Sequence, residues 1–543
     1  MPKGFLNILL HAHLPYVRHP EHSHFFEENW LFEAITECYI PLLTMLDRLQ
    51  ADNICYRLTL SLSPTLISML QDELLQSRYL THLNKLIELS SKEIQRTQQQ
   101  PEYRQLAEWY HQFFEQTLTS YTDRYQGDLL TAFKKHHIQG RVELITCAAT
   151  HGFLPLLNVN DAAIRTQINV GVQTFTEVFG FTPTGFWLPE CGYYPGLEHF
   201  LNEAGIRYFF ADTHSITHAS APSKNSIYAP ISCPNGVAVF ARDPESSQQV
   251  WSAHEGYPGD FDYREYYSDI GFELESDYLA PYLLEDKTRI NTGIKYHRIT
   301  SKEGAKAIYC PATALAKAQL HAADFIAKKH VQSKHLNSLM PTPPMIVAPF
   351  DAELFGHWWF EGPYWLEHVL RLASATPELL STQTGSDYLA YNFAINQATP
   401  SASTWGEDGY YSYWMNESND WIYPYLHQAS TQLEQFVQQL AGLTVSPLQE
   451  RALNQALRSL LLAQSSDWPF IIKSGTTTDY ATKRLTDHLA RFNYLYDSVR
   501  KGKIDERYLT ALEIMDNIFP HINFRDYQTS PNNHDNERSN ASQ

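Results

Sequence analysis

The stretch that decides the fold is PMIVAPFDAELFGHWW, residues 344–359, in which a short apolar run ends at Asp351 and gives way to turn residues and a helical pattern. Runs of this length and composition are typical of buried strands, and a helix after each strand is typical of a parallel sheet. Three further runs also end in reactive residues: FLNILL before His11 and His13, RVELITCAATHG at His151, and TGFWLPE at Glu190. Reactive groups at successive strand ends predict a β/α barrel.

The rest of the chain divides by pattern. We expect the barrel to comprise residues 1–70 and 140–400, and a C-terminal helical domain to comprise residues 401–527, where amphipathic patterns dominate. Residues 528–543 are polar and predicted to be disordered. Residues 71–139 predict an inserted helical subdomain, since apolar positions there step by threes and fours: Leu106, Trp109, Tyr110, Phe113, Phe114, Leu118 and Tyr121.

Composition narrows the function. Forty-one Lys and Arg against 60 Asp and Glu give a net charge of −19, which disfavours nucleic acid and anionic membranes as partners. The six cysteines form no C-x-x-C pair, so neither a zinc ribbon nor a disulfide framework is indicated and a cytoplasmic location fits best. We interpret the N-terminal apolar run as a strand, and no run approaches the roughly 20 apolar residues of a membrane span.

Two carboxylates stand out as candidates for catalysis. Glu190, within GFWLPECGYYPG (185–196), and Asp351 each follow an apolar strand and have aromatic neighbours. Desolvation and mutual charge can keep one such acid protonated while the other stays ionised, which is the chemistry of glycosidases. A separation of about 5–5.5 Å would favour retention of configuration and a wider one inversion, and sequence leaves this open. Other carboxylates compete for these roles: Glu353 and, more weakly, Glu407, Asp408 and Glu417.

Histidines and aromatic residues extend the predicted site. His11 and His13 alternate on one strand and so point the same way, and with His151 they could bind zinc or form hydrogen bonds to sugar hydroxyls. Residues 212–300 are irregular and predict either a functional loop or a surface insertion. Several tryptophans lie in polar surroundings and could form platforms for glucose rings: Trp358, Trp359, Trp405, Trp414 and Trp421.

Together these motifs resemble a known family. HAHLPYVRHP, ELITCAATHGFLPLL, GFWLPECGYYPG, APFDAELFGHWW and TWGEDGYYSYWMNESNDW are similar to the five ordered sequence regions of glycoside hydrolase family 57, in the form found in its 1,4-α-glucan branching enzymes. LLLAQSSDWPF, residues 460–470, resembles the helical-domain motif of that subgroup. The similarity extends from residue 5 to about residue 525.

The resemblance implies an incomplete (β/α)7 barrel with an inserted helical domain and a C-terminal helical domain over the cleft. It implies that Glu190 is the nucleophile and Asp351 the general acid/base, with an α-glucan as substrate and with no cofactor or metal. Residues at the family's substrate-contacting positions are His11, His13, His151, Arg264, Gly293, Trp405, Trp414, Asp467 and, less closely matched, Thr476. His297 stands where some relatives carry tryptophan.

A branching reaction needs a lid, because the covalent intermediate must react with a sugar hydroxyl instead of water. The family carries a tyrosine at the tip of its lid; by spacing we predict Tyr228, with Tyr257 as the alternative. Three other functions stay open from the sequence: a family 57 α-amylase or 4-α-glucanotransferase, a metal-dependent carbohydrate deacetylase, and a non-catalytic glucan-binding protein.

Overall fold

The computed structural model describes residues 1–252, 255–284, 288–300 and 306–528 of the chain. At its centre lies a curled sheet of seven consecutive parallel strands. Their order across the sheet is β7 (Ala238–Ala241), β5 (Tyr208–Ala211), β4 (Gly185–Trp187), β3 (Val142–Cys147), β2 (Leu58–Leu62), β1 (Phe5–Ala12) and β8 (Met345–Asp351). The four runs singled out in the sequence are β1, β3, β4 and β8, as predicted.

The sheet closes only partly. Just beyond β7, the Asp243 N–H donates a hydrogen bond to the Val347 carbonyl of β8 at 2.8 Å, so the two outer strands approach each other without forming a ladder. Short strands extend the edges: β6 (Ile231–Ser232) lies antiparallel to β7, β10 (Asn396–Gln397) pairs with β6, and β9 (Ser381–Thr382) pairs with β1. The predicted incomplete (β/α)7 barrel is confirmed.

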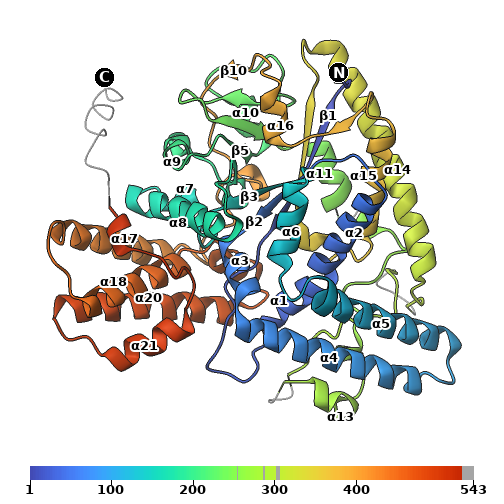
Figure 1. The fold of residues 1–543 in the computed structure, drawn as a ribbon, viewed down its shortest axis with the longest axis horizontal. Helices are drawn as coiled ribbons and strands as arrows, with labels where there is room; N and C mark the ends of the chain where they lie inside the picture. The colour runs from blue at the N-terminus through green and yellow to red at the C-terminus, as the bar shows by residue number, and fades with distance from the viewer. Residues whose placement is uncertain (253–254, 285–287, 301–305, 529–543) are drawn as a thin grey trace.

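Helices surround this sheet (Figure 1). Those that connect or flank the strands are α1 (Glu28–Ala34), α2 (Ile40–Ala51), α3 (Pro64–Gln71), α7 (Leu154–Leu157), α8 (Asp161–Phe179), α9 (Leu197–Glu203), α10 (Thr213–Thr217), α11 (Pro244–Trp251), α14 (Pro311–Leu339), α15 (Gly362–Ala375) and α16 (Gly385–Ala390). A π-helical turn, Ile35–Tyr39, joins α1 to α2. Such turns within helices are often found at functional sites.

The excursion between β2 and β3 is helical, as its periodicity predicts. It contains α4 (Glu73–Arg96), α5 (Pro101–Thr119) and α6 (Leu129–Ile138). Asp72 caps α4 by accepting a hydrogen bond from the Leu75 N–H, and the stripe on α5 buries Leu106, Tyr110 and Phe114. The division into domains at residues 70, 139 and 400 stays a prediction; α6 and β3 lie on either side of the 139/140 boundary.

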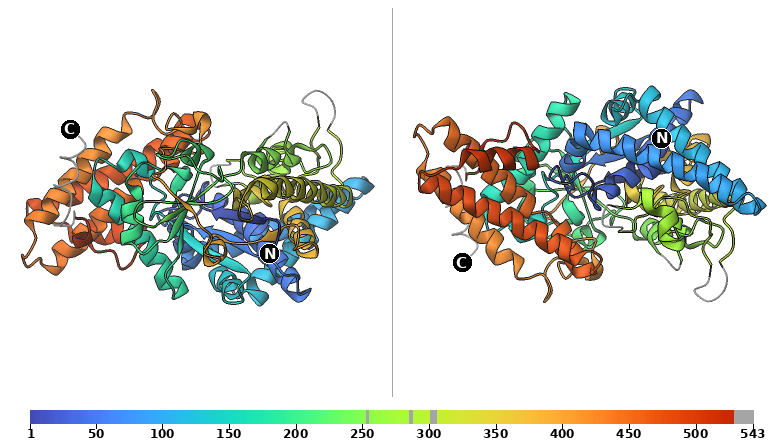
Figure 2. Two further views of the ribbon diagram at one scale, coloured as in Figure 1. Left: turned by 90° about the horizontal axis from the view of Figure 1, so that it is seen from above. Right: turned by 90° about the horizontal axis from the view of Figure 1, so that it is seen from below.

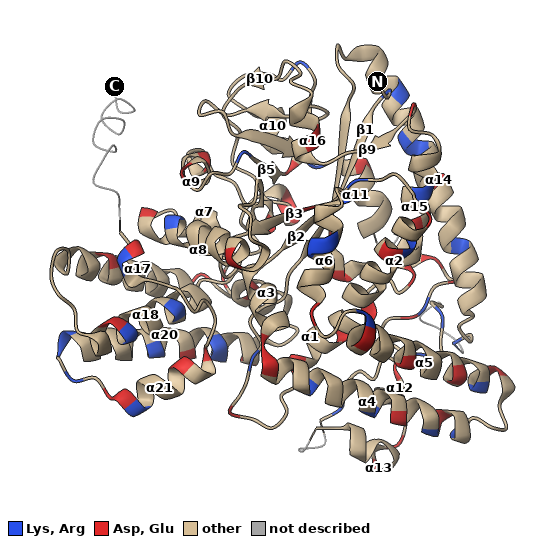
Figure 3. Cartoon of the chain, viewed as in Figure 1, with Lys and Arg blue, Asp and Glu red and all other residues tan. Residues whose placement is uncertain are grey.

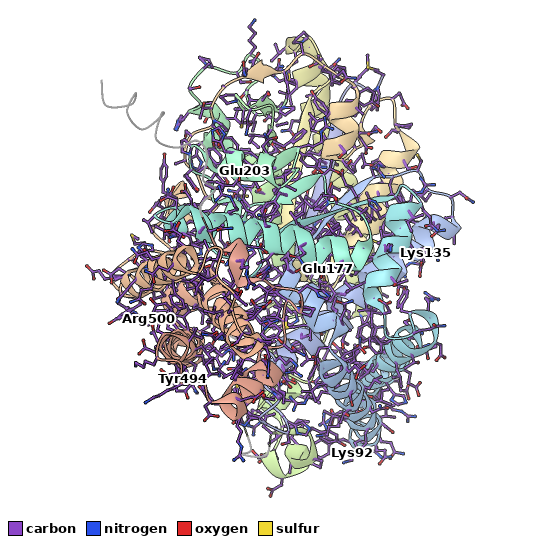
Figure 4. All side chains as sticks on the ribbon, turned by 60° about the vertical axis from the view of Figure 1, so that its left-hand side comes forward. Lys92, Lys135, Glu177, Glu203, Tyr494 and Arg500 are labelled. Atoms are coloured by element: carbon purple, nitrogen blue, oxygen red, sulfur yellow. The ribbon has the colours of Figure 1, made fainter. Side chains whose placement is uncertain are left out.

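The C-terminal region is also helical and lies at the opposite end of the molecule from α4 and α5 (Figure 2). Its helices are α17 (Ile422–Gln439), α18 (Pro447–Ala463), α19 (Asp467–Ser474), α20 (Thr478–Arg500) and α21 (Glu506–Met515). Figure 4 shows α8, on which Glu177 is labelled, beside the C-terminal helices, among them α20, which carries both Tyr494 and Arg500. No helix within the described ranges is both long and apolar enough to span a membrane. Residues 529–543 of the predicted tail lie outside the described residues.

The irregular segment after β7 is anchored to the inserted helices. It contains two short helices, α12 (Ile270–Glu273) and α13 (Ser276–Leu279). The hydroxyl groups of Tyr278 and Tyr296 both donate to the Glu93 carboxylate of α4 at 2.8 Å, and the Tyr110 hydroxyl of α5 donates to the Lys295 carbonyl at 2.7 Å. These hydrogen bonds hold the segment after β7 against α4 and α5.

Candidate active site

Glu190 lies just beyond β4, where the chain turns sharply. Its backbone has φ 61° and ψ 24°, in the left-handed region that residues with a Cβ rarely adopt. Only 13% of its side chain is exposed. The carboxylate accepts a hydrogen bond from Trp405 Nε1–H on Oε2 and one from the Ser466 hydroxyl on Oε1, both at 2.9 Å. Burial raises the pKa of Glu190, and these two donors oppose the rise. Strain of this kind costs about 1–3 kcal/mol and clusters at functional sites.

Asp351 ends β8 and lies beside His11 of β1 in the strand register. None of the described residues donates a hydrogen bond to its carboxyl group. Burial, and then the negative charges of Glu353 and Glu190, raise the pKa of Asp351 well above its usual range. The surroundings of Asp351 therefore favour its protonated form, while the two hydrogen bonds to Glu190 favour the ionised form of that residue.

Glu353 follows Asp351 by two residues and belongs to a short 3-10 turn, Ala352–Leu354. Its Oε1 accepts hydrogen bonds from the Tyr39 hydroxyl at 2.5 Å and from the His13 backbone N–H at 3.2 Å. Burial raises the pKa of Glu353 to about 7, and the Tyr39 bond opposes that rise. The negative charge of Glu353 contributes to the raised pKa of Asp351.

The three histidines gather between these acids. His11 Nε2 and His151 Nε2 are 3.0 Å apart, and the rings of His13 and His151 stack with centroids 3.8 Å apart. His13 Nε2 lies 3.1 Å from an Asp467 oxygen at the start of α19. Burial, followed by the neighbouring histidines, lowers the pKa of His11 and of His151 well below the usual value, so both rings are neutral. Burial alone would raise the pKa of Asp467, but His13 lowers it.

The same cluster contains one set of atoms that could hold a metal ion. Ligating atoms of His11, His151 and Cys147 lie within 4.8 Å of one another, and this set of nitrogen and sulfur donors suits zinc. However, His11 Nδ1 is hydrogen-bonded to Ser61 at 3.1 Å, His151 Nδ1 to Ser466 at 2.8 Å, and the two Nε2 atoms to each other. A metal ion would have to replace the bond between the rings, so the residues fit a hydrogen-bonded cluster better than a metal centre.

The two tryptophans assigned to glucan contacts differ. Trp405 is half-buried beside Glu190, with its ring edge-on to Trp187 at 4.9 Å, and its contact with substrate stays a prediction. Trp414 is only 1% exposed and stacks on Phe153 with centroids 4.6 Å apart. Trp414 is therefore packed against protein in this structure, and its predicted contact with glucan stays a prediction.

Arg264 and Gly293 lie together, away from Glu190. The Arg264 guanidinium is buried, donates to Glu37 Oε1 at 3.0 Å and to the Gly293 carbonyl at 3.3 Å, and stacks on Phe360 at 3.9 Å. Gly293 has φ 73°, which glycine adopts without strain. Arg264 thus binds Glu37 and Gly293 in this structure, and the predicted contact of this pair with substrate stays a prediction.

The remaining predicted residues lie at the periphery. Tyr228 is half-buried, its carbonyl accepts a hydrogen bond from the N–H of Met345 at the start of β8, and its hydroxyl lies 3.4 Å from Asp243, so it is not at a lid tip. Tyr257 is buried and donates to Asp324 of α14 at 2.7 Å. His297 bonds to Ser268 at 2.8 Å. Thr476 is exposed just after α19 and lies 3.1 Å from Ser474.

Sequence reasoning missed two residues that contact the acids. Ser466 donates to Glu190, and Tyr39, from the π-helical turn, donates to Glu353. Ser466 stands directly before Asp467 within the LLLAQSSDWPF motif. The motif therefore indicates that this stretch lies near the site, but not that Ser466 bonds to Glu190. Tyr39 carries no such signal, because a tyrosine in an apolar helix is ordinarily core.

A partly closed barrel with two buried acids of unequal proton affinity, surrounded by neutral histidines and an indole, defines a class: barrel enzymes that act on glycosidic bonds. The comparisons with known proteins give the family. The sequence profile of glycosyl hydrolase family 57 matches residues 7–342, and the profile described as 1,4-alpha-glucan branching enzyme, C-terminal, matches residues 425–527. The chain belongs to glycosyl hydrolase family 57.

Three relatives illustrate the similarity. The 1,4-alpha-glucan branching enzyme of Thermococcus kodakarensis is 34% identical over 555 aligned positions, covering 95% of this chain and 77% of that protein. The alpha-amylase AmyC from Thermotoga maritima, known from a crystal structure, is 45% identical in sequence. The alignment covers 97% of this chain and 99% of the AmyC chain, and the two structures superpose with a TM-score of 0.91. The family 57 branching enzyme of Pyrococcus horikoshii is 32% identical, covers 98% of both chains, and gives a TM-score of 0.87.

Proposed function

We propose that this protein is a 1,4-α-glucan branching enzyme that cleaves an α-1,4 bond and transfers the released chain to a 6-hydroxyl group. One observation carries the proposal: the turn at residues 465–467, within the region that matches the branching-enzyme C-terminal profile, bonds directly to Glu190 and to His13 of the family 57 barrel. The region typical of branching enzymes therefore belongs to the same site as the two acids. The six free cysteines agree with a cytoplasmic location.

The reaction follows from the unequal acids. Glu190 attacks the anomeric carbon while Asp351 gives its proton to the glycosidic oxygen, so the C–O bond breaks and one part of the glucan leaves with a new hydroxyl group. The other part stays as a glucosyl ester on Glu190. The 6-hydroxyl of an acceptor chain then attacks that carbon, Asp351 takes back a proton, and Glu190 is released with configuration retained.

Substrate contacts are assigned by geometry and resemblance together. We assign the donor glucose to the surroundings of His11, His13, His151 and Asp467, whose imidazole rings and carboxylate can bond to sugar hydroxyls. Trp405 supplies an aromatic face beside Glu190. Arg264 and Gly293 are assigned an indirect role through Glu37, and Thr476 a place on the exposed rim.

The lid tyrosine needs a new candidate, since Tyr228 and Tyr257 are tied to the barrel and to α14. Tyr267 is 80% exposed, and its neighbour Tyr266 stacks on the half-exposed Trp358, which follows Asp351 in the same loop, with centroids 4.2 Å apart. We therefore assign the lid tip to Tyr267. Replacing it with alanine is expected to raise hydrolysis relative to transfer, measured as new reducing ends against new α-1,6 linkages.

A second candidate function is α-amylase activity, which the 45% identity to the Thermotoga maritima amylase favours. Incubation with amylose separates the two: a branching enzyme forms α-1,6 linkages with few new reducing ends, whereas an amylase forms reducing ends alone. Glu190→Gln serves as the control, because either activity requires the nucleophile.

Exhaustive chelation is expected to leave turnover unchanged, and loss of turnover would favour the deacetylase alternative built on the histidines. Glucan binding without turnover in the wild type would favour the non-catalytic alternative.

A further inference from the structure

Ser466 occupies the N-cap position of α19 but does not cap that helix. A serine at this position ordinarily accepts a hydrogen bond from a backbone N–H of the first turn. Here φ is −65° and ψ is −18°, and the side chain makes no cap bond. The hydroxyl group is buried, with the residue 1% exposed, and lies 2.9 Å from Glu190 Oε1. The Ser466 hydroxyl group therefore bonds to Glu190 next to β4 of the barrel and not to the first turn of α19.

The hydroxyl group is also the end of a chain of hydrogen bonds that crosses three barrel strands. Ser61 Oγ of β2 lies 3.1 Å from His11 Nδ1, and His11 Nε2 lies 3.0 Å from His151 Nε2. His151 Nδ1 then lies 2.8 Å from Ser466 Oγ. Ser61, His11 and His151 are all buried. His11 and His151 each have one hydrogen-bond neighbour on either side in this chain, and Ser466 links His151 to Glu190.

Only one placement of hydrogens satisfies this chain when Glu190 is ionised. A carboxylate only accepts, so the single Ser466 hydrogen must point to Glu190. Ser466 Oγ then accepts from His151 Nδ1–H. His151 Nε2 is left with its lone pair and accepts from His11 Nε2–H, so His11 Nδ1 accepts from the Ser61 hydroxyl. Each neutral imidazole offers one donor and one acceptor, and the chain uses both on each ring.

We propose that Ser466 is a positioning residue for the nucleophile, and that His151 and His11 fix it as a donor by their tautomers. This inference rests on the proposed role of Glu190. It gives the C-terminal region a part in the chemical step, since Ser466 donates to one carboxylate oxygen of Glu190 while Trp405 donates to the other. Charged or titratable groups that also face Glu190 are Asp351 of β8, Asp467 of α19, and His13 and His151.

Ser466→Ala tests the contact. Loss of a hydrogen bond to a charged group is expected to reduce kcat about 10- to 100-fold, with KM changed by less than about twofold. The acidic limb of the kcat/KM profile should move to higher pH by about one unit, because the carboxylate has lost a donor. Ser466→Thr keeps the hydroxyl group and should restore most of the rate. Ser459→Ala is the matched control, since Ser459 is equally buried in α18 but bonds only to the Gln455 carbonyl at 3.0 Å.

Neutron diffraction of the wild-type protein tests the tautomers without a mutation. At neutral pH the expected map shows deuterium on His151 Nδ1 and His11 Nε2. Deuterium on His151 Nε2 and His11 Nδ1 instead, or wild-type kcat and pH profile in Ser466→Ala, would overturn the inference. Glu190→Gln keeps the two levels apart: if that variant still turns over glucan, the proposed function fails, whereas an inactive Glu190→Gln beside a fully active Ser466→Ala refutes only the role of Ser466.

Discussion

Glu190 and Asp351 owe their difference to their hydrogen-bond partners. Both are largely shielded from solvent, and this desolvation raises the pKa of each. Glu190 has two donors, which favour its charged form, whereas Asp351 has none among the described residues and faces two other carboxylates. The position of the hydrogen-bond donors therefore favours Glu190 as the nucleophile and Asp351 as the acid.

Asp351→Asn is expected to lose activity and gain stability. The general acid contributes about 10²–10⁴-fold to such a rate, so turnover of natural glucan should fall by about that factor. Because the folded-state pKa of Asp351 lies above its unfolded value, the native state binds more protons between the two values, and the free energy of unfolding falls as pH rises through that range. The amide lacks this penalty. Denaturant unfolding should therefore find the variant more stable than wild type by about 1–3 kcal/mol near pH 8, with the difference vanishing below about pH 4. A variant that is less stable at both pH values would contradict this.

Glu353→Gln should change the pH profile while keeping most of the activity. Burial raises the pKa of Glu353 to about 7, so it becomes negative above that pH and helps Asp351 keep its proton. Without this charge the pKa of Asp351 falls, and the alkaline limb of kcat/KM should move to lower pH by about one unit. The glutamine oxygen can still accept from Tyr39. An unchanged alkaline limb would show that the Glu353 charge does not reach Asp351.

At the scale of elements, the π-helical turn Ile35–Tyr39 aligns the loop that follows β8. Its Tyr39 hydroxyl bonds to Glu353, and its Cys38 thiol donates to the Ala352 carbonyl at 3.0 Å. Gly356 has φ 112° and passes so close that an added Cβ would overlap the Glu37 carbonyl oxygen. The turn and the loop thus fit only with glycine at this position.

Gly356→Ala should therefore destabilise the protein by about 3 kcal/mol or more, since a backbone clash adds to the cost of positive φ. Gly442→Ala is the matched control: it also has positive φ, 72°, but an added Cβ meets nothing within 4 Å, so it should cost only about 1 kcal/mol. Thermal and denaturant unfolding measure both. Equal losses in the two variants would mean that the loop moves away from the turn without cost.

Strand ends were predictable and side-chain burial was not. The runs at β1, β3, β4 and β8 reveal themselves by length and β-branched content, and the parallel arrangement then brings Glu190, Asp351 and the histidines to one edge. Trp414 and Arg264 illustrate the limit. Whether an aromatic or cationic side chain faces a sugar or a neighbour such as Phe153 or Glu37 depends on contacts between distant segments, which no local pattern encodes.

Across the whole molecule, three segments contribute residues at or near the site: the barrel, the segment after β7, whose Tyr266 stacks on Trp358, and the turn at residues 465–467. Acidic and basic side chains are interspersed along the outer helices, including α4, α5 and α21 (Figure 3), although the net charge is −19. The site itself is built from neutral rings and buried acids. Such a site suits an uncharged polymer, because a glucan is bound through hydrogen bonds to its hydroxyl groups and through aromatic rings against its sugar faces, not through charge.

Gln167 of α8 joins the barrel to the C-terminal region. Fully buried, it accepts from the Thr150 N–H at 3.1 Å and donates to Thr150 Oγ1 at 2.8 Å and to Gln464 Oε1 at 3.0 Å, beside both His151 and Ser466. Gln167→Leu would leave these buried groups unpaired, so the free energy of unfolding should fall by about 2–4 kcal/mol. The kcat should also fall several-fold with KM little changed, because the two loops that orient Glu190 lose their common anchor. Gln173→Leu, exposed on the same helix and bonded only to Glu177 at 2.8 Å, is the control and should behave as wild type. If the two variants match in stability and turnover, the C-terminal turn is held in place by other contacts and the shared anchor is not needed.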